Sequence, residues 1–312
     1  MTAFPIRIAT RTSPLALAQA EAVRAALADA HRIGMEAFEI VALRTTGDRI
    51  LDRPLAEAGG KGLFTKEIEE ALLDGRADLA VHSAKDLPTE LPPGLEIGGV
   101  PRREDPRDVF ISRVADSIEA LPAGAVVGTA SLRRGALVKR LRPDVKTTTL
   151  RGNVQTRLAK LESGEVQATL LALAGLSRLE MAREATAILD PALFLPAIGQ
   201  GAIAVETRAD DATTREFLAA IDHPASHAAL RCERAFLAVL DGSCRTPIAG
   251  YARIEAGELI FDGLVASPDG QTVHEARQAG DVLDAAELGA AAGRRIIETA
   301  DPAFLAELKQ LG

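Results

Sequence analysis

The chain has 312 residues, of which 47% are hydrophobic and 26% are charged, the balance of an ordinary globular protein. A chain of this length exceeds what one hydrophobic core usually holds and indicates two or three domains. The formal net charge of -8 argues against broad binding of nucleic acid or membrane surfaces, and no apolar stretch approaches the roughly 20 residues of a membrane span.

The N-terminus and the cysteines indicate a cytoplasmic protein. Residues 1–10 are typical of the start of a strand and lack the basic-then-apolar pattern of a signal peptide. Cys232 and Cys244 are too few for a disulfide framework or a zinc site, so we expect a reducing compartment and no bound metal.

Strands and helices alternate along the first two thirds of the chain, which favours α/β layers. A strand is predicted over residues 6–9, and Ser13 and Pro14 then supply the N-cap and the first residue of a helix that runs to about residue 30. The next strand, helix and strand are predicted over residues 38–43, 64–73 and 78–81.

A second set of strands and helices begins after the proline- and charge-rich stretch of residues 100–107. Its strands are predicted over residues 109–112, 125–128, 146–150 and 168–171, and its helices over residues 131–141 and 153–161. Residues 202–205 are predicted to form a buried strand that returns to the first lobe. The last segment is predicted to form a helix over 225–240, three strands between 248 and 277, and a helix over 285–299.

Several arginines follow predicted strands near the starts of helices, namely Arg11, Arg133, Arg134, Arg151 and Arg157. Helix N-termini attract anions, arginine matches carboxylates with a planar fork, and open α/β sheets bind ligands at the carboxyl ends of their strands. One arginine of this kind is more often a solvated surface residue. Several at corresponding turns of two lobes predict a site for an anion with many carboxylates.

Asp86 lies in a run, residues 82–88, that follows a predicted strand and ends at a proline. The spacing leaves two interpretations open: a turn-forming aspartate paired with Lys85 on the surface, or a carboxylate that faces the same cleft as the arginines. His82 in the same run is more typical of a structural histidine than of a catalytic one.

The two cysteines have different settings. Cys232 shares one face of its predicted helix with Ala229 and Phe236, which is typical of a core residue. Cys244 lies in a turn beside Arg245, which favours the thiolate, and is the better candidate for covalent attachment of a group. No His and Asp pair is placed to make it a protease-type nucleophile.

An ordered set of motifs, from residue 7 to about residue 250, resembles the porphobilinogen deaminase family. The motifs are RIATRTSPLAL at 7–17, GGKGLF at 59–64, HSAKDLP at 82–88, GTASLRR at 128–134, LRGN at 150–153, AGLSR at 174–178, GQGA at 199–202 and the loop around Cys244. Each motif is weak alone, but their shared order is specific. The tail after Tyr251 is less diagnostic.

The resemblance implies a transferase that joins four porphobilinogen molecules head to tail, releasing ammonia, into the linear tetrapyrrole hydroxymethylbilane. It implies a dipyrromethane cofactor, the primer for this reaction, covalently attached through the cysteine that matches Cys244. The family's catalytic aspartate matches Asp86. One departure is Ser243, where many members have a glycine, and this exchange of one small residue for another bears on loop geometry more than on attachment.

The resemblance also implies which residues line the site. Those implied to hold the cofactor are Cys244, Asp86, Ser83, Lys85, Thr129, Ser131, Arg133, Arg134 and Arg151. Those implied to hold the substrate are Arg11, Ser13, Lys61, Arg157, Arg178 and Gln200. Each porphobilinogen brings an acetate and a propionate, so a growing chain needs many cationic partners. Losing ammonia leaves a cationic, electron-poor azafulvene, which a carboxylate such as that of Asp86 stabilises.

The implied fold is α/β, with two lobes like those of a type II periplasmic binding protein and a small α+β C-terminal domain. The expected domains are residues 1–101 with 202–219, residues 102–201, and residues 220–312. We expect a monomer that acts on a small molecule, without nucleic acid or membrane.

Two other functions fit part of the pattern. A non-catalytic two-lobed binding protein for a small carboxylate anion would use the same arginines, but it would need neither Cys244 nor a third domain. A cysteine-dependent acyl or sulfur transferase is less favoured, because Cys244 has no histidine partner in the sequence pattern.

Overall fold

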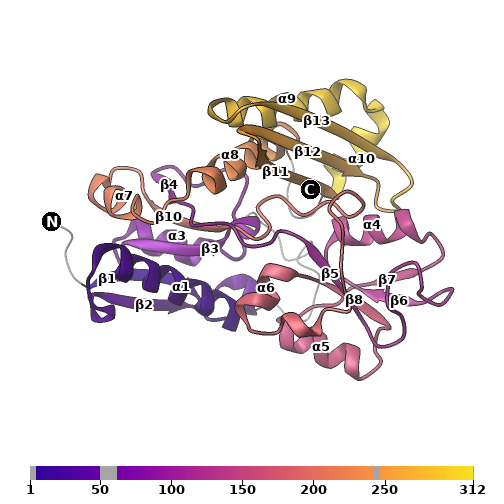
Figure 1. Cartoon of the computed structure of the whole chain (residues 1–312), viewed down its shortest axis with the longest axis horizontal. Coiled ribbons are helices and arrows are strands. Elements are labelled where there is room, and N and C mark those ends of the chain that lie inside the picture. Colours follow the sequence, from indigo (N-terminus) through magenta and orange to yellow (C-terminus); the bar gives the residue numbers. More distant parts are fainter. Residues whose placement is uncertain (1–4, 50–61, 242–245, 312) are drawn as a thin grey trace. The chain divides into compact units, whose positions relative to one another are not determined.

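The computed structural model describes residues 5–49, 62–241 and 246–311 (Figure 1). The chain divides into two compact units, residues 1–104 with 202–227 and residues 105–201 with 228–312. Each unit contains one five-stranded sheet, and the second also contains a three-stranded sheet.

The sheet of the first unit has the strand order β2-β1-β3-β10-β4. Its strands are β1 (Ile6–Arg11), β2 (Phe38–Leu43), β3 (Leu79–Ser83), β4 (Leu95–Gly99) and β10 (Ile203–Arg208). Strand β1 pairs in parallel with β2 and β3, whereas β10 is antiparallel to both β3 and β4. The predicted return of the chain to the first lobe is therefore confirmed.

Helices cover both faces of this sheet. Helix α1 (Pro14–His31) packs Val23 and Leu27 against Ile8, and α3 (Lys66–Leu73) packs on the other face with Ala9. Successive residues of β1 thus point to opposite faces, as the pleat of a strand requires. Two short elements, α2 (Thr46–Arg49) and η2 (Ala84–Asp86), follow β2 and β3.

The second unit repeats this arrangement, with the strand order β7-β6-β8-β5-β9. Its strands are β5 (Asp108–Ser112), β6 (Val126–Gly128), β7 (Lys146–Thr148), β8 (Ala168–Ala172) and β9 (Ala187–Ile188). Strand β6 is parallel to β7 and β8, and β5 is antiparallel to β8 and β9. In both sheets one antiparallel strand therefore separates the parallel part from an edge strand.

Local capping explains where the helices of these lobes begin. The Ser13 hydroxyl accepts the Ala16 N–H at 3.3 Å, and Pro14 starts α1. Asn153 accepts the Thr156 N–H at 2.8 Å at the start of α5 (Val154–Glu162). Ser131 has the same role for α4 (Leu132–Leu141), and α6 (Leu173–Arg178) follows β8.

The C-terminal part is a three-stranded antiparallel sheet covered by helices. Its elements are β11 (Ile248–Glu255), β12 (Glu258–Ala266), β13 (Val273–Asp281), α8 (Pro224–Val239), α9 (Ala285–Thr299) and α10 (Pro302–Leu311). Phe236, Phe261 and Ile296 are buried together in its core. The expected fold class, two α/β lobes and a small α+β C-terminal part, is thus confirmed.

Some elements differ from the sequence-based expectation. Strand β1 extends two residues beyond the predicted end and carries Arg11 as its last residue, and α3 begins at Lys66, after the predicted start at Phe64. The patterns did not predict the elements β4, β9, α2, α6, α10 and α7 (Ala212–Leu218). Most of these are short, so they show too few periods for a pattern to be read.

Gly289 of α9 permits close contact with α8, because a methyl group there would collide with the carbonyl oxygen of Cys232. We predict that Gly289→Ala lowers the free energy of unfolding by about 1–3 kcal/mol, as expected for an overpacked helix contact. The matched control is Gly135→Ala in α4, where the nearest atoms lie 3.9 Å from the added methyl group and better helix propensity should maintain stability. Thermal denaturation followed by circular dichroism compares them, and equal melting temperatures would contradict the close packing of α8 on α9.

Candidate active site

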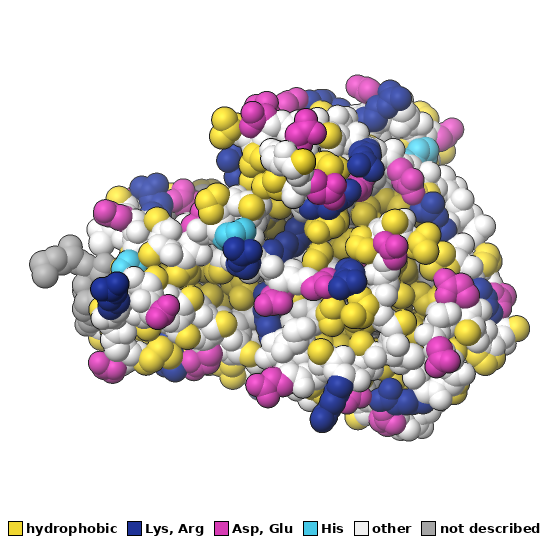
Figure 2. Space-filling model, viewed as in Figure 1, with side chains coloured by type: hydrophobic (Ala, Val, Ile, Leu, Met, Phe, Trp, Pro, Cys, Tyr) yellow, Lys and Arg dark blue, Asp and Glu magenta, His cyan; other side chains and the backbone are white. Residues whose placement is uncertain are grey.

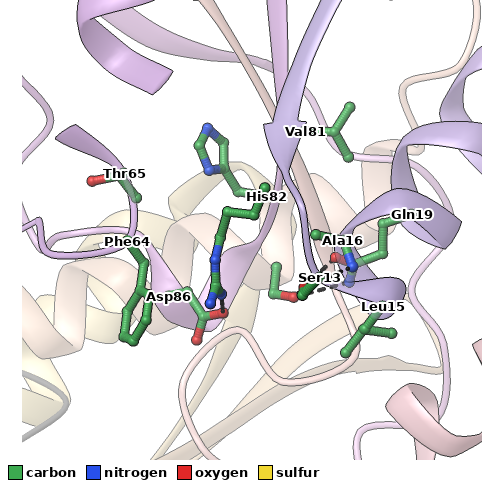
Figure 3. Close-up of a pocket in the computed structure, with 11 residues that line it drawn as sticks. Ser13, Leu15, Ala16, Gln19, Phe64, Thr65, Val81, His82 and Asp86 are labelled. Atoms are coloured by element: carbon green, nitrogen blue, oxygen red, sulfur yellow. Dashed lines mark hydrogen bonds and ion pairs between the residues drawn. The ribbon is translucent and has the colours of Figure 1, made fainter. Parts of the chain in front are cut away.

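A pocket opens in the first unit at the carboxyl ends of β1 and β3 (Figure 3). Three segments line it: the end of β1 with the start of α1, the turn before α3, and the end of β3 with η2. The lining residues are Arg11, Ser13, Leu15, Ala16, Gln19, Phe64, Thr65, Val81, His82, Ser83 and Asp86. The structure therefore brings together four of the predicted site residues, Arg11, Ser13, Ser83 and Asp86, at the place where open α/β sheets bind ligands.

The guanidinium of Arg11 lies between two carboxylates. Its Nη2 and Nε atoms bond both oxygens of Asp48, at 2.5 and 3.3 Å, while Nη1 lies 3.7 Å from Oδ2 of Asp86. The ring of Phe64 lies against it, 4.3 Å from the guanidinium carbon to the ring centroid. Burial opposes ionisation of Asp48, but the hydrogen bond and the charge of Arg11 outweigh it and hold the pKa of that carboxyl below its usual value.

Asp86 is held by the 3₁₀ turn η2 that follows β3, with a third of its side chain exposed. Figure 3 shows its carboxylate beside the ring of Phe64. Nearby Ser83 exchanges hydrogen bonds with Gln19 of α1, at 2.9 and 3.1 Å, which fixes the end of β3. Lys85 precedes Asp86 in η2 and is half-buried. The geometry is that of a partly solvated carboxylate beside a cation.

A buried group of ionisable residues lies on the α3 face of the same sheet. Nε2 of His82 is 3.1 Å from Oε2 of Glu206 in β10, at ion-pair distance without hydrogen-bond geometry, and both side chains are almost fully buried. Burial raises the pKa of Glu69 in α3, and the neighbouring charge of Glu206 adds to the effect. The structural interpretation of His82 fits this setting. Sequence reasoning missed both glutamates, because isolated glutamates are usually exposed.

In the second unit, Arg133 and Arg134 at the start of α4 share one buried partner, Asp108 of β5. Nη1 of Arg133 bonds Oδ2 at 2.7 Å, and Nε and Nη2 of Arg134 bond Oδ1 at 2.9 and 2.7 Å. The arginines are 4% and 6% exposed and Asp108 is 0% exposed. Burial opposes ionisation of Asp108, but the two guanidinium groups hold its pKa far below the usual range.

This triad was not foreseen from the sequence, where Asp108 stands in an ordinary run of charges. Two guanidinium groups face one carboxylate, so the start of α4 keeps a net positive charge at a helix N-terminus. Nε of Arg133 is buried and has no hydrogen-bond partner among the described residues. The site is therefore suited to one further anion.

The other predicted residues of the second unit are held by the backbone. Nε of Arg157 donates to the carbonyl of Gly152 at 2.9 Å, and Nη2 of Arg178 donates to that of Gly201 at 2.8 Å. Gln200 is buried and donates to the carbonyl of Pro106 at 2.7 Å. Thr129 accepts the N–H of Ser131 at 3.1 Å. Arg151, just before the Asn153 cap, is half-buried.

Two predicted residues, Cys244 and Lys61, lie outside the described residues. Cys232 is a core residue of α8, as predicted, and burial raises the pKa of its thiol to about 12.

Within residues 5–49, 62–241 and 246–311, no group of three or more His, Cys, Asp or Glu side chains could hold a metal ion. In the same ranges, no helix has the length and hydropathy needed to cross a bilayer. On the face drawn in Figure 2, acidic and basic side chains are interspersed.

Two family models match the chain. The model described as "Porphobilinogen deaminase, dipyromethane cofactor binding domain" matches residues 6–216, and the model described as "Porphobilinogen deaminase, C-terminal domain" matches residues 228–298. Curated porphobilinogen deaminases from Nitrobacter winogradskyi and Nitrobacter hamburgensis are each 56% identical over 297 residues, covering 95% of this chain and 94% of theirs.

Among solved structures, the chain is similar to a periplasmic substrate-binding protein of an ABC transporter from Coxiella burnetii. The TM-score is 0.44 at 14% sequence identity, covering 72% of this chain and 94% of that chain.

The buried triad generates a stability prediction. Asp108→Asn leaves two buried guanidinium groups without a counter-charge and should lower the free energy of unfolding by about 3–5 kcal/mol at pH 7. Because the folded state depresses the pKa of Asp108, its contribution is present above the unfolded pKa, about 3.9, and is lost as pH falls through the lower folded value. The difference between wild type and variant should therefore shrink below about pH 4.

Chemical denaturation at pH 7 and at pH 3 measures this difference. The matched control is Asp144→Asn, which removes a surface partner of Arg142 and should leave stability unchanged. Equal loss in the two variants would show that Asp108 does not compensate the buried charges.

Proposed function

The chain belongs to the porphobilinogen deaminase family, and from that premise we propose that Asp86 is its catalytic carboxylate. The enzyme is a transferase of porphyrin and heme biosynthesis that joins porphobilinogen molecules head to tail into hydroxymethylbilane, with release of ammonia. Family membership over nearly the whole chain favours this activity over that of a non-catalytic anion-binding protein.

The observation that supports the proposal is the pairing of Asp86 with Arg11 in the pocket of the first unit, at 3.7 Å. The substrate carries carboxylates that a guanidinium binds, and losing ammonia leaves a cationic carbon that a carboxylate stabilises. Asp86 is partly exposed and its contact with Arg11 is long. Its oxygens therefore remain available to stabilise that cation and to accept or return the protons of the coupling step.

The family's first domain is described as cofactor-binding, and the residues present fit a dipyrromethane with several carboxylates. The net positive charge of the triad and the unpartnered Nε of Arg133 suit a carboxylate. When bound, the cofactor supplies the pyrrole to which the first substrate unit is joined. The residues proposed to hold it are Arg133, Arg134, Arg151, Thr129, Ser131, Ser83, Lys85 and Asp86.

We further propose that Cys244 carries the cofactor through a thioether, which makes each coupling intramolecular. Support comes from the other cysteine, because Cys232 is buried in a helix core with a raised pKa and is poorly suited to nucleophilic attack. The residues proposed to bind the carboxylates and polar groups of the substrate are Arg11, Ser13, Lys61, Arg157, Arg178 and Gln200.

The proposal includes the organisation of the chain into residues 1–101 with 202–219, residues 102–201 and residues 220–312. In this scheme each of the first two domains contains one five-stranded sheet, and the third contains the antiparallel sheet with α8, α9 and α10. We propose a cytoplasmic monomer that uses porphobilinogen and needs no nucleic acid.

Intact-mass measurement tests the attachment. Wild type and Cys232→Ser, produced in cells that make porphobilinogen, should both carry a mass increment equal to one dipyrromethane. Cys244→Ser should lack it, because the thiol that forms the thioether is gone. An unmodified wild type, or an adduct retained in Cys244→Ser, would refute this attachment.

Asp86→Asn tests the catalytic role. It keeps the shape of the side chain and removes the charge, so turnover should fall by at least about a hundredfold. The control is Asp74→Asn, an exposed aspartate paired with Arg76 outside the pocket, which should keep full activity. Turnover is measured as hydroxymethylbilane formed from porphobilinogen, with circular dichroism to confirm the fold. Near-normal turnover in Asp86→Asn would transfer the role to another residue.

A further inference from the structure

The geometry around Arg11 points to a role for a second aspartate. We propose that Asp48 is a positioning residue that holds the Arg11 guanidinium away from Asp86 and so keeps the Asp86 carboxylate free for the substrate. This inference rests on the proposed function of Asp86, but Asp48 itself is neither in the resembling motifs nor among the pocket-lining residues.

The two carboxylates hold Arg11 unequally. Both carboxylate oxygens of Asp48 accept hydrogen bonds from Arg11, one from Nε and one from Nη2. Asp86 has a single contact, between its Oδ2 and Nη1 of Arg11 at 3.7 Å, which is beyond hydrogen-bonding distance. The ring of Phe64 packs against the guanidinium, with its centroid 4.3 Å from the guanidinium carbon, and so covers one side of the group. A small shift of the guanidinium away from Asp48 would bring Nη1 of Arg11 within hydrogen-bonding distance of Asp86.

Asp48 is itself fixed by its neighbours. Its Oδ2 accepts the hydroxyl of buried Thr45 at 2.8 Å and the Thr45 N–H at 3.3 Å. The next residue, Thr46, donates its N–H and hydroxyl to Oε1 of Glu67 in α3, at 2.8 and 2.6 Å. The carboxylate of Glu67 thus attaches α2 to α3. The carboxylate of Asp48, also in α2, binds Arg11 instead.

The competition follows from charge and distance. A guanidinium with two anionic neighbours divides its attraction between them, and the bidentate pair is the stronger. Removing the charge of Asp48 leaves Asp86 as the anionic partner of Arg11 among the described residues. A close ion pair there would occupy the oxygens of Asp86 and stabilise its ionised form before substrate arrives.

Other charged groups face the same region and contribute to the electrostatic environment of Asp86. His82 of β3 lines the pocket, with Glu206 of β10 at 3.1 Å and Glu69 of α3 near them. Lys85 precedes Asp86 in η2, and Glu67 of α3 is bonded to Thr46. All of these groups remain in place when only Asp48 is changed, so a change in the titration of Asp86 reports on Arg11 and on the direct loss of the Asp48 charge, which the Arg11→Met background separates.

The test is the titration of the Asp86 carboxyl, followed by carbon-13 NMR and assigned by its loss in Asp86→Asn. In Asp48→Asn the pKa of Asp86 should fall by about one unit, the lower end of the effect of a close guanidinium. The acid limb of the pH dependence of kcat should move to lower pH by the same amount, and kcat at neutral pH should fall. Asp48→Ala removes the same charge and should give the same shift if Asp48→Asn proves unstable.

Two comparisons isolate the mechanism. In an Arg11→Met background, Asp48→Asn should lower the pKa of Asp86 much less than it does with Arg11 present, because only the direct repulsion between the two carboxylates is then lost. Glu67→Gln is the matched control, since it removes a carboxylate that attaches α2 without contacting Arg11, and it should leave the titration unchanged. An unshifted titration in Asp48→Asn, or an equal shift in Glu67→Gln, would overturn the inference.

The outcome is separable from that of the proposed function. If Asp86→Asn retained turnover, the catalytic role of Asp86 would fail, yet the carboxyl titration would still report whether Asp48 controls Arg11. If Asp86→Asn were inactive and the titration did not move, the catalytic role would stand and the role of Asp48 would fail.

Discussion

Guanidinium groups in both lobes are paired with aspartates of their own unit, and this pairing determines how the strand ends are arranged. A buried charge is tolerated only when it is paired and hydrogen-bonded. Asp108 can be fully buried at the start of β5 because Arg133 and Arg134 meet it from α4. The same contacts fix the first turn of α4 against the sheet, so the positive end of that helix is held in a fixed place.

The first unit uses the same interaction in a more open setting. Arg11 ends β1 and is held by Asp48 and the ring of Phe64, while Asp86 follows β3 beside it. A site whose charges are oriented before the ligand binds needs little reorganisation during reaction. The surrounding fold fixes that orientation in advance, through the hydrogen bonds of Thr45 and Glu67 and through the short elements α2 and η2.

Short-range features of this fold could be predicted from the sequence, and long-range charge pairing could not. The caps Ser13, Ser131 and Asn153 were readable because a cap and its helix are adjacent. The core placement of Cys232 followed from helical periodicity. By contrast, Asp108 and its arginines are 25 and 26 residues apart. The burial of Glu206 depends on the strand it joins, and nothing in its local sequence distinguishes it from a surface glutamate. Arg11 and Asp86 were expected in one cleft, yet the aspartate that holds Arg11 was not.

The strand order of the first lobe has a consequence for biosynthesis. Among the described strands, β4 is bonded to its sheet only through β10, whose residues, Ile203–Arg208, leave the ribosome about a hundred residues after β4. The sheet of the second lobe, by contrast, takes all its strands from one continuous segment that ends at Ile188. During synthesis the second sheet can therefore be completed before the first. Until β10 has been synthesised, β4 has no partner strand in the N-terminal lobe. In this state the lobe exposes a strand edge that a chaperone can bind.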